Sequence, residues 1–293
     1  MKDKYVEGKK SIAKAIKHDP LTAVFYYNRG VSYYDMGNRE KALADYNQAI
    51  ELDPELKDAY INRGLVYQEE GNYDMAIADY TRAINLDPEC GLAYKNSGYA
   101  YFCKGDYDKA IADYTMAMDL DPEIPATYND RGVAYDNKGK YDEAITDFIM
   151  AIELDPEHID SYINRGTTYR KKGDYNGALA DYARAIVLNP GYAAAYYNRG
   201  LAHYYSQDPD KAIADFAMAI KLDPKNGTAY YNCGLSHVLK GNNDKAIIDF
   251  TRSIKLYPKD ADGYYNRGLC YQQKGEHEKA KTDFSKAKDL SLK

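Results

Sequence analysis

Apolar and small residues recur along the chain at a fixed interval of 34 residues, eight times, without an insertion or deletion. Each interval carries a tyrosine, then a glycine four residues later, then an alanine twelve residues after that glycine. The tyrosines are Tyr26, Tyr60, Tyr94, Tyr128, Tyr162, Tyr196, Tyr230 and Tyr264. A fixed period of this length is typical of a solenoid, in which each interval is one supersecondary unit stacked on the next.

One interval, residues 57–90, shows the predicted elements. A first helix carries apolar residues at helical spacing and is expected to end at Gly71. A second helix is expected to begin near Asn72 or Tyr73. Asp87-Pro88 is expected to stop it, because proline disfavours helical backbone in the residue before it. One face of this second helix repeats apolar residues with the period of a buried stripe, at Ala76, Ile77, Tyr80, Ala83 and Ile84.

The pattern resembles the tetratricopeptide repeat (TPR) family over residues 23–292, where Tyr, Gly, Tyr, Ala, Tyr or Phe, Ala and Pro occupy the family's motif places. The departures are local. His203 and His237 stand in place of the second tyrosine, Ser253 replaces a small alanine, and Gln207 replaces the glycine of a helix bend. The resemblance implies an all-α fold, a right-handed superhelical α-solenoid of antiparallel helix hairpins.

The expected domain organisation follows from the period. Residues 1–22 are interpreted as an N-terminal capping helix or a truncated half repeat. The remainder is divided into eight repeats at residues 23–56, 57–90, 91–124, 125–158, 159–192, 193–226, 227–260 and 261–293.

Composition narrows the classes of partner. The formal net charge of −6 and the isoelectric point near 5.5 argue against nucleic acid or an anionic membrane, because both select basic surfaces. The mean hydropathy is −0.69 and no long apolar stretch occurs, so no membrane insertion is expected. The sequence starts without an apolar signal-peptide region. The four cysteines form no CxxC pair, which favours reduced thiols and a cytoplasmic protein; an extracytoplasmic location would require that a targeting segment was removed.

Catalytic motifs are missing from the sequence. It contains no Gly-rich phosphate loop, HExxH, nucleophile elbow or calcium loop, so we expect neither enzymatic activity nor a cofactor. His203, His237 and Cys233 could together bind zinc in principle. Replacement of a structural tyrosine explains both histidines equally well, so no metal site is predicted.

The resemblance implies that the first helix of each repeat lines a concave groove. Two places after the first tyrosine, seven of the eight repeats carry an asparagine, and Asp130 breaks the series. An amide offers both a donor and an acceptor and can therefore hold a peptide backbone without reading its sequence. This series is similar to the asparagine ladder in the repeat domain of the eukaryotic O-linked N-acetylglucosamine transferase. The alternative is that the amides bond only to each other or to helix ends. The asparagines are Asn28, Asn62, Asn96, Asn164, Asn198, Asn232 and Asn266.

Aromatic and aliphatic residues gather in the C-terminal third of the predicted groove. Tyrosines among aliphatic side chains are typical of an interaction hot spot, although tight curvature of the solenoid would instead bury them against each other. Acidic groove residues at Asp35, Asp58, Glu69 and Asp136 favour a neutral or basic partner. The aromatic and aliphatic candidates are Tyr197, Leu201, Tyr204, Tyr205, Tyr231, Leu235, Val238, Leu239, Tyr265 and Leu269.

A charged pair also recurs. Six first helices carry an arginine before their glycine, and every second helix carries an aspartate three residues after its alanine, which predicts ion pairs between the helices. Ser97 and Cys233 replace the arginine in two repeats, so Asp113 and Asp249 need other partners.

The sequence therefore favours a non-catalytic scaffold that binds an extended peptide segment of a partner protein. Two alternatives stay open: a self-assembling homo-oligomeric scaffold, and a substrate-recruiting module of a larger enzyme. The concentration dependence of the mass would separate self-assembly from peptide binding.

Overall fold

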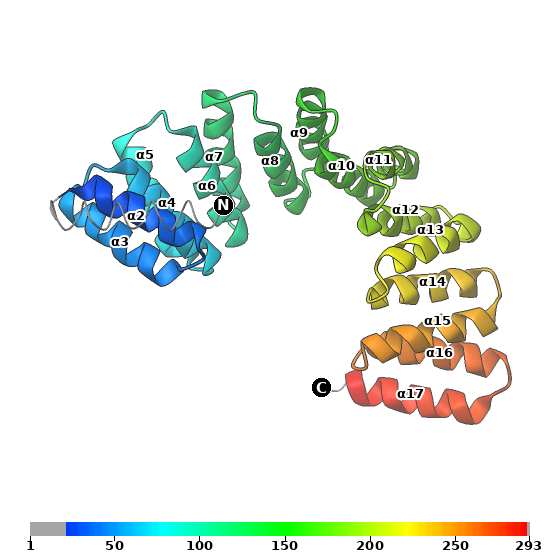
Figure 1. The fold of residues 1–293 in the computed structure, drawn as a ribbon. Helices are drawn as coiled ribbons and strands as arrows, with labels where there is room; N and C mark the ends of the chain where they lie inside the picture. The colour runs from blue at the N-terminus through cyan, green and yellow to red at the C-terminus, as the bar shows by residue number, and fades with distance from the viewer. Residues whose placement is uncertain (1–21, 292–293) are drawn as a thin grey trace. The chain divides into compact units, whose positions relative to one another are not determined.

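The computed structural model describes residues 22–291, and all regular structure in that range is α-helical (Figure 1). The chain divides into two compact bodies, an N-terminal body of residues 1–154 and a C-terminal body of residues 155–293. The predicted capping helix or half repeat at residues 1–22 lies outside the described residues, apart from Thr22.

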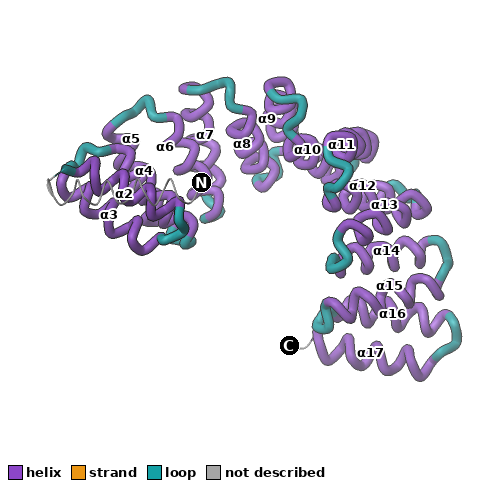
Figure 2. Tube along the Cα trace, viewed as in Figure 1, coloured by secondary structure: helices purple, strands orange, loops and turns teal. Residues whose placement is uncertain are grey.

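Each body is built from helix pairs (Figure 2). The first helix of a pair has thirteen or fourteen residues, and the second helix has fourteen or fifteen. The pairs of the N-terminal body are α2 (Ala23–Asp35) with α3 (Arg39–Leu52), α4 (Lys57–Glu69) with α5 (Tyr73–Leu86), α6 (Gly91–Cys103) with α7 (Tyr107–Leu120), and α8 (Pro125–Asn137) with α9 (Tyr141–Leu154).

The described part of the C-terminal body continues the same scheme. Its pairs are α10 (Ile159–Lys172) with α11 (Tyr175–Leu188), α12 (Ala193–Tyr205) with α13 (Pro209–Leu222), α14 (Gly227–Leu239) with α15 (Asn243–Leu256), and α16 (Ala261–Gln273) with α17 (His277–Ser291). The prediction of an all-α fold of helix hairpins is confirmed.

The bends between paired helices need a left-handed backbone. Seven of them place a glycine at positive φ, as at Gly71 with φ 77°. Residues other than glycine rarely adopt this conformation, because their Cβ atom comes too close to the backbone carbonyl oxygen. In the α12–α13 bend Gln207 adopts φ 62° instead. Second helices often begin at a side-chain cap; Asp208, for example, accepts a hydrogen bond from the backbone N–H of Lys211.

The close approach of the two helices in a pair depends on a glycine facing an aromatic ring. A Cβ built on Gly64 would lie 2.7 Å from a ring carbon of Tyr80, and one on Gly200 would lie 2.7 Å from a ring carbon of Phe216. These rings are fully buried. The same glycine and ring, sixteen residues apart, recur in all eight described pairs and set the spacing of each hairpin.

Stacking within each body follows one rule. Every second helix packs on the first helix of the next pair, and neighbouring first helices also contact each other. Within residues 22–154 and within residues 155–291, second helices make no comparable contact with one another. The first helices therefore lie closer together than the second helices. None of the helices described combines the length and the apolar composition needed to cross a bilayer.

Candidate functional site

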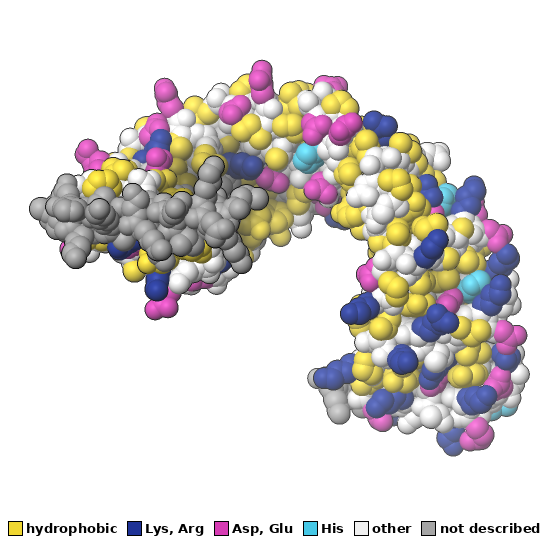
Figure 3. All heavy atoms as spheres, viewed as in Figure 1, with side chains coloured by type: hydrophobic (Ala, Val, Ile, Leu, Met, Phe, Trp, Pro, Cys, Tyr) yellow, Lys and Arg dark blue, Asp and Glu magenta, His cyan; other side chains and the backbone are white. Residues whose placement is uncertain are grey.

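The candidate site is the exposed surface of the first helices α10, α12, α14 and α16, which we call the first-helix face. It carries the predicted tyrosines, leucines and asparagines of the C-terminal body. Apolar side chains reach the surface of this body alongside scattered lysine and arginine side chains (Figure 3).

Most of the predicted contact residues are half-buried rather than free. Tyr197, Leu201 and Tyr204 pack against the buried core around Phe216. Tyr231 and Leu235 pack in the same way around Phe250, as does Val238. The rings of Tyr197 and Phe216 are 5.8 Å apart between centroids, and those of Tyr231 and Phe250 are 5.7 Å apart.

Three large side chains of the predicted set remain exposed. Tyr205 at the end of α12 is 49% exposed, Leu239 at the end of α14 is 45% exposed, and Tyr265 near the start of α16 is 52% exposed. Tyr205 also packs edge-on against Tyr204, with a centroid distance of 5.4 Å. The exposed candidates are thus distributed over three successive first helices.

The asparagines make a bond that the sequence analysis did not anticipate. Asn232 donates through Nδ2 to the hydroxyl oxygen of Tyr197 at 3.0 Å, and Asn266 donates to that of Tyr231 at 3.0 Å. Asn62 makes the same bond to Tyr27, at 3.1 Å, in the N-terminal body. Each bond joins neighbouring first helices and spans 35 residues of sequence. The sequence does contain a signal for this bond. In each case the preceding repeat carries a tyrosine directly before its own asparagine position, and that tyrosine accepts the bond.

The bond depends on that tyrosine. The repeat before Asn96 offers Ile61, a buried aliphatic residue that cannot accept a hydrogen bond. The Nδ2 of Asn96 is buried and has no hydrogen-bond partner among the described residues. Asn28, on α2, is exposed; Asn164 and Asn198 are half-buried on α10 and α12. The seven asparagines therefore do not form one uniform ladder.

Burial changes the acidity of the tyrosines on this face. Burial, the nearby carboxylates of Asp262 and Asp260 and the ring of Tyr204 together raise the pKa of Tyr231 to about 12, against an opposing effect of the Asn266 amide. Burial likewise raises the pKa of Tyr197 and of Tyr204. All three stay neutral phenols at physiological pH and can donate as well as accept hydrogen bonds.

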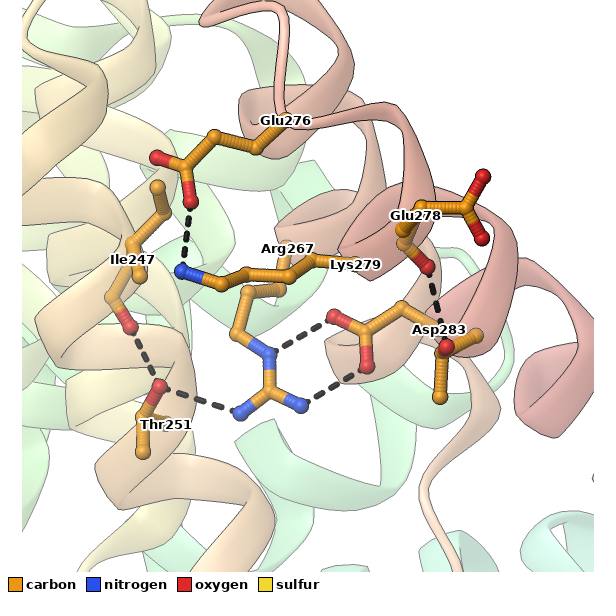
Figure 4. A network of polar contacts seen from close by, with 8 residues as sticks. Ile247, Thr251, Arg267, Glu276, Glu278, Lys279 and Asp283 are labelled. Atoms are coloured by element: carbon orange, nitrogen blue, oxygen red, sulfur yellow. Dashed lines mark hydrogen bonds and ion pairs between the residues drawn. The ribbon is translucent and has the colours of Figure 1, made fainter.

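The predicted arginine–aspartate pairs are confirmed. In α16–α17, Arg267 donates through Nε and Nη2 to the two carboxylate oxygens of Asp283, both at 2.8 Å (Figure 4). Its Nη1 donates to the hydroxyl of Thr251 on α15 at 3.0 Å, so one guanidinium contacts three helices. The same two-bond contact occurs in Arg29–Asp45, Arg63–Asp79, Arg131–Asp147, Arg165–Asp181 and Arg199–Asp215.

Burial and ion pairing act in opposite directions on these carboxylates. Burial raises the pKa of Asp79 and of Asp181, while the arginine opposite each one lowers it. Hydrogen bonding to Asp79 raises the pKa of Arg63, so both members remain charged at neutral pH. Pairs of this kind fix the register of the two helices more than they add net stability, because desolvation offsets the attraction.

In the two repeats without arginine, other side chains bond to the aspartate. Burial raises the pKa of Asp113, and a hydrogen bond from the hydroxyl of Ser97 lowers it. The thiol of Cys233 bonds to Asp249, and burial again raises the pKa of this carboxyl. His237 lies nearby, with Nε2 3.7 Å from Oδ2 of Asp249. The four cysteines are free thiols, as the sequence predicted.

Comparison with known proteins identifies the repeat. The family model described as "Tetratricopeptide repeat" matches residues 23–56, 58–90, 125–158, 193–226 and 261–291. A model described as "TPR repeat" matches residues 98–139, 166–207 and 234–275, and a further tetratricopeptide repeat model matches residues 148–180. A search of curated proteins found no match.

Solved structures agree with this assignment. The chain is 30% identical to MamA, with 55% of this chain and 94% of MamA covered and a TM-score of 0.53. It is 25% identical to YrrB, described as a TPR protein with an unusual peptide-binding site, with 63% and 95% covered and a TM-score of 0.52. A tetratricopeptide repeat protein from Parabacteroides merdae is 18% identical, with 85% and 98% covered and a TM-score of 0.67, which supports the fold alone.

The glycine-to-aromatic hairpins, the second-helix-to-first-helix stacking and family models covering more than half of the residues lead to one assignment: this chain belongs to the tetratricopeptide repeat family.

Proposed function

We propose that this chain is a non-catalytic scaffold that holds an extended segment of a partner protein against its first-helix face. The observation that carries the proposal is the exposure of Tyr205, Leu239 and Tyr265 on three successive first helices. Tyr205 and Leu239 are the last residues of α12 and α14, and Tyr265 lies near the start of α16, so the three are spread across the face. Exposed aromatic and aliphatic side chains on one surface are typical of protein contact sites. A partner in extended conformation would have to run obliquely across these helices to contact all three.

The half-buried tyrosines would form the rigid part of this surface. Tyr197 and Tyr231 are each fixed by packing on a phenylalanine and by a hydrogen bond from the next asparagine. Side chains that are ordered before binding lose little conformational entropy when a partner arrives. Their role is therefore to support the contact, while the exposed residues supply most of the area that binding would bury.

The asparagines would contribute through their oxygens. Asn232 uses Nδ2 for Tyr197 and for the carbonyl oxygen of Thr228 at 3.0 Å, and Asn266 uses it for Tyr231 and for that of Asp262 at 2.9 Å. An amide nitrogen has two hydrogens, so both are engaged. Each side-chain oxygen can then accept a backbone N–H of the partner.

The expectation of a neutral or basic partner rests on the acidic residues of the N-terminal first helices, because the first-helix face carries both signs of charge: Arg170 lies over the ring of Tyr205, 5.8 Å from its centroid, and Asp262 lies at the start of α16. The exposed carboxylate of Asp262 lies close enough to Tyr231 to raise its pKa. The similarity to YrrB, a TPR protein with a peptide-binding site, supports peptide binding as the mode of recognition. We propose that lysine-containing or neutral segments bind more tightly than acidic ones.

The test is peptide selection followed by affinity measurement. Peptides selected from a display library on the intact chain would be titrated against a Tyr205→Ala, Leu239→Ala, Tyr265→Ala variant. A matched control, Val187→Ala with Ile248→Ala, removes side chains on second helices that are 67% and 54% exposed. We expect the first-helix variant to bind about tenfold or more weakly and the control to bind like the parent.

Equal binding by the parent and the first-helix variant would contradict the proposal, and loss of binding in the control alone would place the contact on the second helices. Sedimentation of the parent over a range of concentrations addresses the alternative. A mass that rises with concentration and falls back in the first-helix variant would show that a second copy of the chain occupies this face.

A further inference from the structure

Two repeat positions change together in the α14–α15 pair, and both face the same aspartate. Cys233 stands where six other pairs have arginine, and His237 stands where most have tyrosine. The other exceptions change only one position: Ser97 is accompanied by Tyr101, and His203 is accompanied by Arg199. Only this pair among residues 22–291 combines a thiol and an imidazole beside the aspartate, which is here half-buried.

The three side chains are close and enclosed. Cys233 and His237 lie four residues apart on α14 and are 5% and 8% exposed, and Asp249 reaches them from α15. One ligand atom of each residue lies within 4.8 Å of the other two. The Nδ1 atom of His237 is buried and has no hydrogen-bond partner among the described residues. Its Nε2 lies 3.7 Å from Asp249, beyond hydrogen-bond distance.

We propose that Cys233, His237 and Asp249 bind a Zn²⁺ ion. Zinc accepts thiolate sulfur, imidazole nitrogen and carboxylate oxygen, usually in tetrahedral arrangement. Bond lengths of about 2.0–2.3 Å would place the ligand atoms about 3.4–3.6 Å apart. The 3.7 Å between His237 and Asp249 is already near that separation. The side chain of Asp249 is 16% exposed, so a water molecule can reach the fourth position.

The charge of the site fits a divalent cation. In six of the other pairs an arginine guanidinium forms two hydrogen bonds with the aspartate, and Asp249 has no such bidentate partner, although Arg252 and Lys245 lie near enough to act on it electrostatically. Zinc would replace that positive charge, and the thiolate and carboxylate together would balance its two charges. Binding breaks the S–H bond of Cys233, forms a Zn–S bond and releases the proton to solvent. The neutral imidazole of His237 is the form that would coordinate the ion.

Cations near the site will moderate the affinity. Lys245 acts on all three side chains, Lys240 acts on His237, and Arg252 acts on Asp249. Coordination requires the thiolate form of Cys233, so the metal must displace the thiol proton. We therefore expect binding to strengthen as pH rises.

Packing and hydrogen bonding alone explain the replacement of arginine by Cys233 and of tyrosine by His237 taken separately, but not why both occur in one repeat. Ser97 shows that a small donor opposite the aspartate is sufficient, and it needs no histidine beside it. His203 shows that histidine can replace the tyrosine while Arg199 still pairs with Asp215. The metal site is inferred because both changes occur around one carboxylate and bring a thiol sulfur, an imidazole nitrogen and a carboxylate oxygen within 4.8 Å of one another.

The experiment uses the intact chain, freed of metal with a chelator and titrated with Zn²⁺ in competition with a chromophoric chelator, and separately with Co²⁺. We expect one ion per chain and a thiolate-to-cobalt charge-transfer absorption in the near ultraviolet. At a free Zn²⁺ concentration a hundredfold above the dissociation constant, Tm should rise by about 5 °C.

Matched variants distinguish this site from other thiols. Cys233→Arg with His237→Tyr restores the residues of the other repeats and should fold, yet bind Zn²⁺ about a hundredfold or more weakly. His203→Tyr and Cys270→Ser should bind like the parent. Failure of the parent to compete with the chelator, a cobalt spectrum without the thiolate absorption, or equal binding by the restored variant would each overturn the proposal.

Discussion

In the helix pair α16–α17, Asp283 receives two hydrogen bonds from Arg267, whereas in α14–α15 Asp249 faces a thiol and an imidazole. The two pairs nevertheless share the same hairpin, because Gly268 and Gly234 approach Phe284 and Phe250 in the same way. The comparison separates what shapes a repeat from what is free to vary in it. Steric contact between glycine and ring sets the geometry, while the buried carboxylate accepts several kinds of partner.

The largest effect is expected where the two pairs agree. A Cβ at position 234 or 268 would lie 2.8 or 2.7 Å from a ring carbon, so Gly234→Ala and Gly268→Ala should each lower the free energy of unfolding by about 3 kcal/mol. Urea unfolding followed by circular dichroism measures this. Gly191→Ala is the control, since its Cβ would come no nearer than 3.4 Å to a flexible side chain. If only one of the two substitutions lowered the free energy of unfolding, the two hairpins would differ in packing.

The second effect is expected where the pairs differ. Asp283→Asn leaves Arg267 buried beside a neutral group and should cost about 3 kcal/mol, because an uncompensated charge remains. Asp249→Asn removes a half-buried carboxylate that forms no two-bond contact with an arginine, and should change stability by less than about 1 kcal/mol. Both are measured by urea unfolding of metal-free protein. Equal losses would show that Cys233 and His237 hold the aspartate as firmly as an arginine does.

A smaller effect is expected when the arginine–aspartate ion pair is restored in α14–α15. Cys233→Arg should supply the missing guanidinium and raise the free energy of unfolding by about 1 kcal/mol, since the gain in hydrogen bonds exceeds the cost of burying the cation by a small margin. Thermal melting of metal-free protein, with Ser97→Arg as the parallel change opposite Asp113, measures the gain. A loss of stability in both would mean that these two hairpins no longer accommodate an arginine.

The smallest effect concerns pH. Burial raises the folded-state pKa of Asp249 above 3.8, so the folded chain binds the proton more readily than the unfolded chain. Stability of the parent is therefore penalised above the folded pKa, and the penalty disappears as pH falls toward 4. The advantage of Asp249→Asn over the parent should shrink over this range. Burial lowers the pKa of His237 and the carboxylate of Asp249 opposes this, so the variant loses that opposing effect and is destabilised further as pH falls below 6.5. This change also makes the advantage of the variant shrink toward low pH.

Unfolding curves of parent and variant at pH 7, 5.5 and 4 measure this difference. Both proteins are metal-free in this measurement. Burial, the largest effect, raises the pKa of Asp249, while the thiol of Cys233 and the cations Lys245 and Arg252 lower it and so reduce the difference. A constant difference across the three pH values would contradict the raised pKa.

Much of the fold followed from the sequence because its determinants lie within one repeat. The ends of α4 and α5 agree with the predicted stops at Gly71 and Asp87-Pro88. The ion pairs were predictable because arginine and aspartate lie sixteen residues apart on two antiparallel helices, whose relative register the hairpin fixes. Gln207 shows the limit of such reasoning, since it takes the left-handed bend without being a glycine.

The site was less predictable because its contacts cross from one repeat to the next. The bond between Asn232 and Tyr197 depends on how far neighbouring first helices slide along each other, which the sequence period does not define. Tyr231 is half-buried and bonded by Asn266 of the next first helix, α16, whereas Tyr265 is 52% exposed. This difference also depends on contacts between neighbouring first helices. The sequence also grouped His203 with Cys233 and His237, whereas the structure brings Asp249 of the second helix to that thiol and imidazole.

The third bond of the arginine fork has a mechanical consequence. Arg267 reaches back to Thr251 on α15, which fastens its helix pair to the one before it. The residue at the corresponding place before Arg199 is Ala183, which offers no side-chain acceptor. In the α11–α12 and α15–α16 joints, which both have the arginine, one side chain on the second helix thus decides whether this third bond forms. The α11–α12 joint is expected to bend more easily than the α15–α16 joint, and Ala183→Thr would stiffen it without touching either hairpin.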